Sequence, residues 1–310
     1  MRILFYEAGS ANSDAWLDAL RAELPQAQLR VWREGDDEPA DYAVAWRPPL
    51  EMLRPRPGLK AVFNIAAGVD AILKFGDALP KGVPLVRLDD AGMAIQMAEY
   101  VSHAVLRYFR RFDEYAGQAR ERSWRRLEPN RKEDFPVGIL GLGVLGSRVT
   151  AALAHFGFPL HGWSRSKKDL AGVHCHAGVD GLDEFLRSVR VVVCLLPLTA
   201  ETTGLLNRAT LSRLPRGSYL INVARGGHVV EQDLLELVRQ GHIAGATLDV
   251  FGEEPLPPAH PFWDEPRITI TPHISALTLR HESARQIADK IRKLERGEAI
   301  AGIVDLARGY

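Results

Sequence analysis

The chain has 310 residues, about twice the length of a common single domain, which predicts two domains or one large α/β domain. Its content of 46% apolar and 25% charged residues is that of an ordinary globular protein. Because 39 basic residues balance 39 acidic ones, the composition argues against a general nucleic-acid binder, which needs a basic surplus to neutralise phosphates.

Cysteine usage and apolar runs indicate the compartment. Cys175 and Cys194 are too few for a disulfide framework, and neither belongs to a Cys-x-x-Cys pair. A charge interrupts the N-terminal run Met1–Glu7 too early for a signal peptide, and the strongest apolar run, Val191–Leu198, is far too short to span a membrane. We therefore expect a soluble protein of the reducing cytoplasm, with neither membrane nor nucleic acid as a partner.

Short apolar runs alternate along the chain with stretches of helical period, a pattern typical of βα repetition and a largely parallel sheet. In the first third, apolar side chains of Asp14–Leu24 recur on one helical face. The strands predicted there are Arg2–Tyr6, Leu29–Trp32, Tyr42–Trp46, Ala61–Ile65 and Leu85–Arg87.

A single long helix is predicted from about Ala91 to Ser123, and it ends in the charge-dense segment Arg120–Asp134. One interpretation of that segment is a solvated helix end and linker. The other is an arm that packs on a partner subunit, favoured by Trp124 and the nearby Arg110 and Arg111.

After Pro136 the strand–helix pattern starts again. Near the end of the chain, Ile287, Ile291 and Leu294 recur at helical spacing among lysines and arginines, which predicts an amphipathic helix. Six strands are predicted in this part: Val137–Leu140, Pro159–Trp163, Val191–Leu196, Ser218–Val223, Ala246–Val250 and Ile268–Thr271.

A glycine-rich hexapeptide follows the first of these strands and opens a predicted helix, which is the context that a dinucleotide-binding G-x-G-x-x-G turn requires. Its glycines allow the tight turn, the approach of backbone to a pyrophosphate, and close packing of helix on strand. The residues predicted to contact the cofactor here are Gly141, Gly143, Val144, Leu145 and Gly146.

The end of the next strand carries the choice between NAD and NADP. An NAD site places an acidic residue there for the ribose 2′-hydroxyl. This chain has no acid before Asp169, and cations and hydroxyls that suit a 2′-phosphate instead. We therefore predict NADP, with NADPH preferred over NADH, bound by Trp163, Ser164, Arg165, Ser166 and Lys167.

Three downstream segments, Asn222–Gly227, Leu248–Pro257 and Thr271–Ile274, together with the glycine turn, resemble the D-isomer-specific 2-hydroxyacid dehydrogenases in order and spacing. The resemblance covers nearly the whole chain. Within that family the glyoxylate/hydroxypyruvate reductase A branch is the most similar, through Ala45–Pro49, Trp163–Lys167 and Ala307–Tyr310.

The resemblance implies that Arg225 binds substrate, that His273 is the catalytic acid, and that Glu254 pairs with it. The chemistry is consistent, because reduction of a 2-keto acid needs a hydride donor, a proton donor and a cation for the carboxylate. A neighbouring Glu254 would favour imidazolium and fix the ring. Structural roles stay open for each: a turn histidine, a solvated glutamate and an ion-paired arginine.

Further contacts follow from the family's pattern. A backbone loop that holds the substrate carboxylate corresponds to Ala67, Gly68 and Val69, with Ala66 in place of a glycine, and Trp46 would shape the pocket. Packing is an equally good explanation for Trp46. The implied cofactor contacts are Leu196, Pro197, Thr202, Val223, Ala224 and Asp249, the last of which would bind the nicotinamide carboxamide.

No metal site is expected at His174-Cys175-His176, because no second ligand pair follows at a zinc-like spacing. Alternation along a strand would also point His174 and Cys175 to opposite faces.

The family implies a Rossmann-type doubly wound parallel-sheet domain, residues 99–280, inserted into a smaller flavodoxin-like α/β domain formed by 1–98 and 281–310, and a homodimer. The expected function is NADPH-dependent reduction of glyoxylate or hydroxypyruvate to glycolate or glycerate. Two alternatives stay open: the same reaction on a bulkier 2-keto acid, or an NAD(P)-sensing binding protein on the same fold.

Overall fold

The chain divides into two compact units, Met1–Met93 with Thr278–Tyr310 and, between them in sequence, Ala94–Leu277. The structure is a computed structural model, and it describes residues 1–9 and 13–309. Tyr310, which ends one of the segments behind the predicted subgroup, lies outside the described residues. The unit boundaries fall a few residues before the predicted 98/99 and 280/281.

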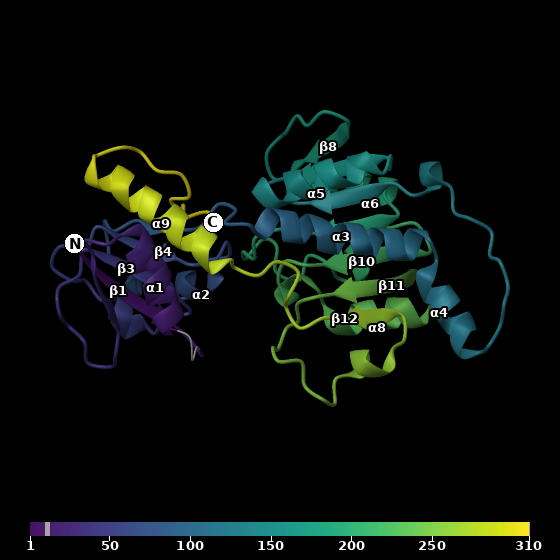
Figure 1. Cartoon of the computed structure of the whole chain (residues 1–310). Coiled ribbons are helices and arrows are strands. Elements are labelled where there is room, and N and C mark those ends of the chain that lie inside the picture. The colour runs from purple at the N-terminus through teal and green to yellow at the C-terminus, as the bar shows by residue number, and fades with distance from the viewer. Residues whose placement is uncertain (10–12, 310) are drawn as a thin grey trace. The chain divides into compact units, whose positions relative to one another are not determined.

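The first unit is built on a five-stranded parallel sheet in the order β2-β1-β3-β4-β5, which is the flavodoxin-like order (Figure 1). All five predicted strands are confirmed. Their bounds are β1 Arg2–Glu7, β2 Gln28–Val31, β3 Tyr42–Trp46, β4 Ala61–Asn64 and β5 Leu85–Val86. The helices of this unit are α1 Ser13–Glu23, α2 Asp70–Leu73 and α9 Arg280–Glu295.

The apolar pattern explains these elements. Ile3, Leu4 and Phe5 are consecutive and fully buried, as expected for a parallel strand covered on both faces. The predicted stripe of α1 is buried, and α1 packs on α9, whose Ile287 and Ile291 are fully buried. An antiparallel bridge between Val86 and Ile303 joins β5 to the C-terminal segment.

The second unit contains a seven-stranded parallel sheet in the order β12-β11-β10-β9-β6-β7-β8. Six of its strands match the prediction, and the edge strand β8 does not, because its sequence alternates histidines with other residues and forms no apolar run. The bounds are β6 Val137–Leu140, β7 Leu160–Ser164, β8 Val173–Ala177, β9 Val191–Cys194, β10 Ser218–Asn222, β11 Ile243–Leu248 and β12 Ile268–Ile270.

The prediction of one long helix up to Ser123 is wrong. The structure has two helices, α3 Met93–Phe109 and α4 Phe112–Arg120, separated at Arg111, whose φ of 61° is left-handed and cannot continue a helix. The remaining helices of this unit are α5 Val144–His155, α6 Gly178–Ser188, α7 Arg208–Leu211 and α8 Glu231–Arg239. Short 3₁₀ turns of the chain are Leu50–Leu53, Gly76–Ala78, Lys132–Asp134, Gly226–His228 and Pro261–Asp264.

Helices cover both faces of the seven-stranded sheet, which confirms the predicted doubly wound Rossmann-type architecture (Figure 1). On one face, α3 and α5 pack on the side of β9 that carries Val191 and Val193. On the other face, α6, α7 and α8 pack on the side that carries Val192 and Cys194. This alternation of buried side chains to two faces is the period of two expected of a central strand.

No helix among residues 1–9 and 13–309 combines the length and apolarity needed to cross a lipid bilayer.

The strand order of the second unit reverses between β9 and β6, since the chain runs from β6 outward to β8 on one side and from β9 outward to β12 on the other. In open parallel sheets, ligands bind beyond the carboxyl ends of the strands at such a switch point. The loops that follow β6, β9 and β10 are therefore the place to look for a functional site.

Candidate functional site

Three predicted catalytic residues follow neighbouring strands. Arg225 comes three residues after β10, Glu254 six after β11 and His273 three after β12. Because these strands are parallel and adjacent in the sheet, their following loops meet at one edge. Backbone bonds join the loops: Asp249 N donates to Asn222 O at 3.0 Å, and His273 N donates to Asp249 O at 2.9 Å.

His273 and Glu254 form a pair. The ring Nδ1 lies 2.8 Å from Glu254 Oε2, and the other carboxylate oxygen accepts the Phe251 N–H at 3.1 Å. With Nδ1 engaged, Nε2 is the ring nitrogen available to an incoming group. The His273 side chain is 36% exposed, so the ring is partly in contact with solvent.

The backbone of His273 is in the left-handed region, with φ of 56°. A non-glycine residue seldom adopts this conformation, and where it persists the surroundings hold it. Here the holding group is Asp249, whose carbonyl accepts the His273 N–H.

Asp249 is fully buried, and its carboxylate organises the loop that carries His273. Its Oδ1 accepts from the Thr271 hydroxyl at 2.5 Å and from Ile274 N at 2.8 Å, and its Oδ2 accepts from Ser275 N at 2.8 Å. The sequence predicted a contact between Asp249 and a nicotinamide carboxamide. The structure adds a role in positioning the loop, and the contact with the carboxamide stays a prediction.

Tyr100 of α3 extends this network and was not found from the sequence. Its hydroxyl lies 2.5 Å from Thr271 Oγ1. Since Thr271 has one proton and points it at Asp249, Tyr100 is the donor. Burial raises the pKa of Tyr100 to about 12, so its hydroxyl keeps that proton near neutral pH.

The turn that presents Arg225 is held against the loop that carries Glu254. The fully buried Asn222 accepts from Ala224 N at 3.2 Å and donates to Arg225 O at 3.0 Å. A Cβ on Gly226 would lie 1.8 Å from the Phe251 carbonyl carbon, so only glycine allows this approach. The Arg225 guanidinium donates to Ala224 O at 2.7 Å.

His228 is a fully buried residue that sequence reasoning missed. Its Nδ1 lies 2.9 Å from Arg225 O and its Nε2 3.3 Å from Pro197 O, so the ring bridges the loops after β10 and β9. The sequence offered only a weak signal, because His228 directly follows the segment Asn222–Gly227 that was used for Arg225.

The loop after β9 contains several of the predicted cofactor contacts. The Thr202 hydroxyl forms hydrogen bonds within the loop: it donates to Pro197 O at 2.7 Å and accepts from Thr199 N at 2.9 Å. Leu196 is buried, and so are Val223 and Ala224 after β10. Their side chains pack in the core, which leaves backbone groups as what this edge offers to a ligand.

The glycine turn has the shape expected of a pyrophosphate site. Gly141 has φ of 103°, and a Cβ on it would lie 2.8 Å from Leu195 O. A Cβ on Gly146 would lie 1.9 Å from Gly141 O, so this glycine lets α5 pack close to the strand. Around Gly143, by contrast, no described atom other than those of its chain neighbours and its own helix backbone lies within 4 Å of such a Cβ. Packing does not require this glycine, whereas a ligand approaching the backbone would.

α5 begins directly at this turn, with Gly143 as its N-cap and Val144, Leu145 and Gly146 in its first turn. No side chain caps it and its first turn carries no acidic residue. The N–H groups at a helix start favour an anion, so the residues present fit a dinucleotide pyrophosphate.

The end of β7 places three of its five predicted residues in solvent. Arg165, Ser166 and Lys167 are exposed, and the turn is closed by Ser164, whose hydroxyl donates to Ser166 O at 2.7 Å. Trp163 is buried and its indole N–H donates to Gly178 O at 2.8 Å, so its side chain packs within this unit and its contact with the cofactor stays a prediction.

The substrate-binding residues predicted in the first unit follow β3 and β4. Asn64 Nδ2 donates to Ala66 O and to Gly68 O, both at 2.8 Å, which curls the loop. Ala67 and Gly68 are half-buried, and Val69 is buried as the N-cap of α2. Trp46, at the end of β3, is half-buried, with the Arg47 guanidinium 5.4 Å from its ring centroid.

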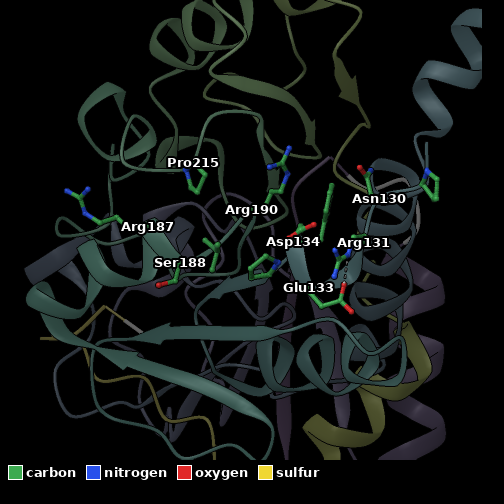
Figure 2. A pocket seen from close by; sticks show the side chains of 12 residues that line it. Asn130, Arg131, Glu133, Asp134, Arg187, Ser188, Arg190 and Pro215 are labelled. Carbon is green, nitrogen blue, oxygen red and sulfur yellow. Dashed lines mark ion pairs between the residues drawn. The ribbon is translucent and has the colours of Figure 1, made fainter. Parts of the chain in front are cut away.

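Figure 2 shows a separate cavity of about 680 Å³ lined by charged side chains, including Arg131, Asp134, Arg187 and Arg190. Its lining includes Pro136, Arg190 and Pro215, which precede β6, β9 and β10. It therefore lies at the amino edge of the sheet, opposite the catalytic candidates, and is not part of their site.

The sequence profile described as D-isomer specific 2-hydroxyacid dehydrogenase, NAD binding domain, matches residues 102–275, more than half of the chain. The chain belongs to this family. The matched range lies within the second unit, and the resemblance predicted from the motifs is confirmed.

Relatives of the dehydrogenase share its full length. Glyoxylate/hydroxypyruvate reductase A of Serratia proteamaculans (strain 568) is 52% identical over 100% of both chains, and the protein of that name from Yersinia enterocolitica is 49% identical over the same extent. The predicted branch of the family is thus the one to which these similar proteins belong.

Solved structures of similar proteins belong to the same family. A D-isomer specific 2-hydroxyacid dehydrogenase from Xanthobacter autotrophicus Py2, in complex with NADPH and MES, has a TM-score of 0.94 at 42% identity, covering 100% of this chain and 99% of that one. The NADPH-dependent glyoxylate/hydroxypyruvate reductase of Sinorhizobium meliloti, in complex with NADP and sulfate, has a TM-score of 0.92 at 35% identity, with the same coverage.

The two kinds of glycine in the turn give a matched pair of variants. Gly146→Ala should lower the free energy of unfolding by ~1–3 kcal/mol, because its methyl group overlaps Gly141 O. Gly143→Ala should leave stability within about 0.5 kcal/mol but weaken dinucleotide binding about ten-fold or more. Urea unfolding and fluorescence titration with NADPH and NADH measure the two effects. Equal losses of stability in both variants would contradict this assignment.

Proposed function

We propose that the dehydrogenase reduces a small 2-keto acid, glyoxylate or hydroxypyruvate, to glycolate or glycerate with NADPH, in the cytoplasm. The observation that carries this proposal is the pair in which Glu254 Oε2 lies 2.8 Å from His273 Nδ1. This pair stands beside the Arg225 turn, at the carboxyl edge of a dinucleotide-binding sheet. The names of the full-length relatives support the substrate class.

His273 acts as the general acid. Glu254 stabilises the positive charge of the imidazolium and holds the ring through Nδ1, so that the proton on Nε2 points outward. When bound, NADPH supplies a hydride to the carbonyl carbon. His273 then gives its Nε2 proton to the carbonyl oxygen, and the products are the 2-hydroxy acid, NADP⁺ and neutral histidine.

Arg225 binds the substrate carboxylate and polarises the carbonyl oxygen. Its planar guanidinium offers paired N–H donors that match a carboxylate. Its backbone carbonyl is held by Asn222 and His228, so the side chain starts from a fixed point. The loop Ala67–Val69 of the first unit, whose backbone Asn64 arranges, corresponds in sequence to the family's carboxylate-binding loop, and its contact with substrate stays a prediction.

The preference for NADPH comes from Arg165 and Lys167. Both are exposed at the end of β7, next to the Ser164–Ser166 turn, and no carboxylate lies between Trp163 and Lys168 to repel a 2′-phosphate. Structural relatives in complex with NADPH or NADP support this choice.

The acid role is tested with His273→Asn and Glu254→Gln. We expect His273→Asn to lower kcat by about 10²–10⁴-fold, because the proton donor is lost. Glu254→Gln should lower kcat less and leave KM nearly unchanged, since only the orientation and charge of the ring change. The decrease of absorbance at 340 nm with glyoxylate and hydroxypyruvate measures both.

The exposed His155→Asn is the control and should retain full activity. Near-normal turnover of His273→Asn would refute the acid role. Oxidation of NADPH with phenylpyruvate, but with neither glyoxylate nor hydroxypyruvate, would support the proposed mechanism and show that the substrate is a bulkier 2-keto acid. No turnover with any 2-keto acid, despite NADPH binding, would refute the enzymatic proposal in favour of a sensing protein.

Removal of both cations, Arg165→Ala with Lys167→Ala, should lower kcat/KM for NADPH about 10²-fold or more, because each charge-assisted hydrogen bond contributes ~1.5–3 kcal/mol. The value for NADH should change little. Lys168→Ala is the control at a neighbouring exposed position and should preserve the preference. An equal loss with both cofactors would contradict the assignment.

We propose a homodimer formed through the segment after α3. Phe112 and Tyr115 of α4 and the following Trp124 are exposed, the last completely. Figure 1 shows α4 and this segment extending from the body of the second unit. A second copy of the chain would cover the three aromatic rings, which a lone chain leaves in water.

Light scattering on the eluting chromatography peak should give twice the 34.4 kDa chain mass. Trp124→Arg should shift the peak toward the monomer and keep the fold, because the Trp124 side chain is fully exposed in the described structure. A strict monomer for the unaltered protein would refute the dimer, and a Trp124→Arg dimer would refute this surface.

A further inference from the structure

Four titratable side chains gather on one face of the sheet edge, away from the catalytic candidates. His174 and His176 lie two residues apart on β8 and therefore point to the same face. His161 on the neighbouring β7 pairs with His174 in the parallel register. The fourth group is Glu184 of α6, the helix that packs on both strands.

The ligand atoms of three of these residues already converge. One atom each from His174, His176 and Glu184 lies within 4.8 Å of the other two. The separation between His176 Nδ1 and Glu184 Oε2 is 3.5 Å. Ligands bound to a tetrahedral zinc ion at ~2.0–2.1 Å lie about 3.4 Å apart, so modest side-chain rotations close the set.

His161 occupies the position of a supporting group. Its Nδ1 lies 3.1 Å from His176 Nε2, the ring nitrogen that does not face Glu184. Metal-binding histidines usually engage their second nitrogen in such a hydrogen bond, which fixes the tautomer and the ring. His176 is also buried and packs edge-on against Phe185, so the central ligand is held rigidly.

Burial differs among the three ligands in a way that suits an open metal site. His176 is 4% exposed, whereas His174 and Glu184 are exposed and can adjust to an ion arriving from solvent. Two imidazoles and one carboxylate are a donor set typical of zinc and neighbouring divalent metals, with water as the fourth ligand.

We propose that His174, His176 and Glu184 bind a divalent transition metal of the zinc class, with His161 positioning His176. The ion joins edge strand β8 to α6. This proposal departs from the expectation of no metal here, which considered only spacing along the chain. The alternation argument was correct for His174 and Cys175, but it also places His174 and His176 together.

The test uses the untagged full-length protein and Co²⁺ as a spectroscopic probe, because tetrahedral Co²⁺ absorbs visible light strongly. We expect one Co²⁺ per chain, displaced by Zn²⁺, and a rise in the melting temperature with Zn²⁺. His174→Asn and Glu184→Gln remove exposed ligands without disturbing the core, and each should weaken binding at least ten-fold. His161→Asn should weaken it about 10–100-fold, as loss of a supporting group does.

Two controls exclude other ligands. His155→Asn alters an exposed histidine of the same unit that lies outside the cluster, and Cys175→Ser removes the thiol between the two histidines. Both should bind Co²⁺ like the unaltered protein. Binding that survives in His174→Asn and Glu184→Gln, binding lost in Cys175→Ser, or no binding at micromolar metal would each overturn the proposal, and none of these outcomes bears on catalysis.

Discussion

The candidate active site depends on the hydrogen bonds that the buried carboxylate of Asp249 accepts. They fix Thr271, Ile274 and Ser275, and thereby the left-handed backbone of His273 between them. A buried charge without partners is costly, so three donors must stay in place for the fold to retain Asp249. The same donors determine the position of the His273 backbone, from which the imidazole extends. Core stability and the geometry of proton transfer are therefore linked through one side chain.

A second constraint is the distance at which backbones approach one another. Gly226 lets the Arg225 turn touch Phe251, and Gly146 lets α5 touch Gly141, at separations that a methyl group would prevent. Both contacts bring a loop to the carboxyl edge and hold it there. Gly143 has no such neighbour, which separates the glycine that a ligand requires from those that packing requires.

From the sequence we could predict the elements that have a repeating apolar pattern and the turns that match a compact motif. Buried runs such as Val191–Cys194 identify central strands because both faces are apolar, and the glycine turn follows from its place between strand and helix. The break at Arg111 was missed because its helical neighbours share one apolar period. The positioning role of Asp249 was missed because a sequence does not show that Thr271, Ile274 and Ser275 converge on its oxygens.

The histidine cluster is a second case in which the sequence does not show which side chains come together in the fold. Spacing along the chain gives His174 and His176 as an unremarkable pair, since the third and fourth groups come from another strand and from a helix. Only the parallel register of β7 with β8 brings His161 beside them, and only the packing of α6 adds Glu184. An edge strand tolerates such polar residues because water reaches one side of it. β8 thus lacked the apolar run that identifies a strand for the same reason that it can carry metal ligands.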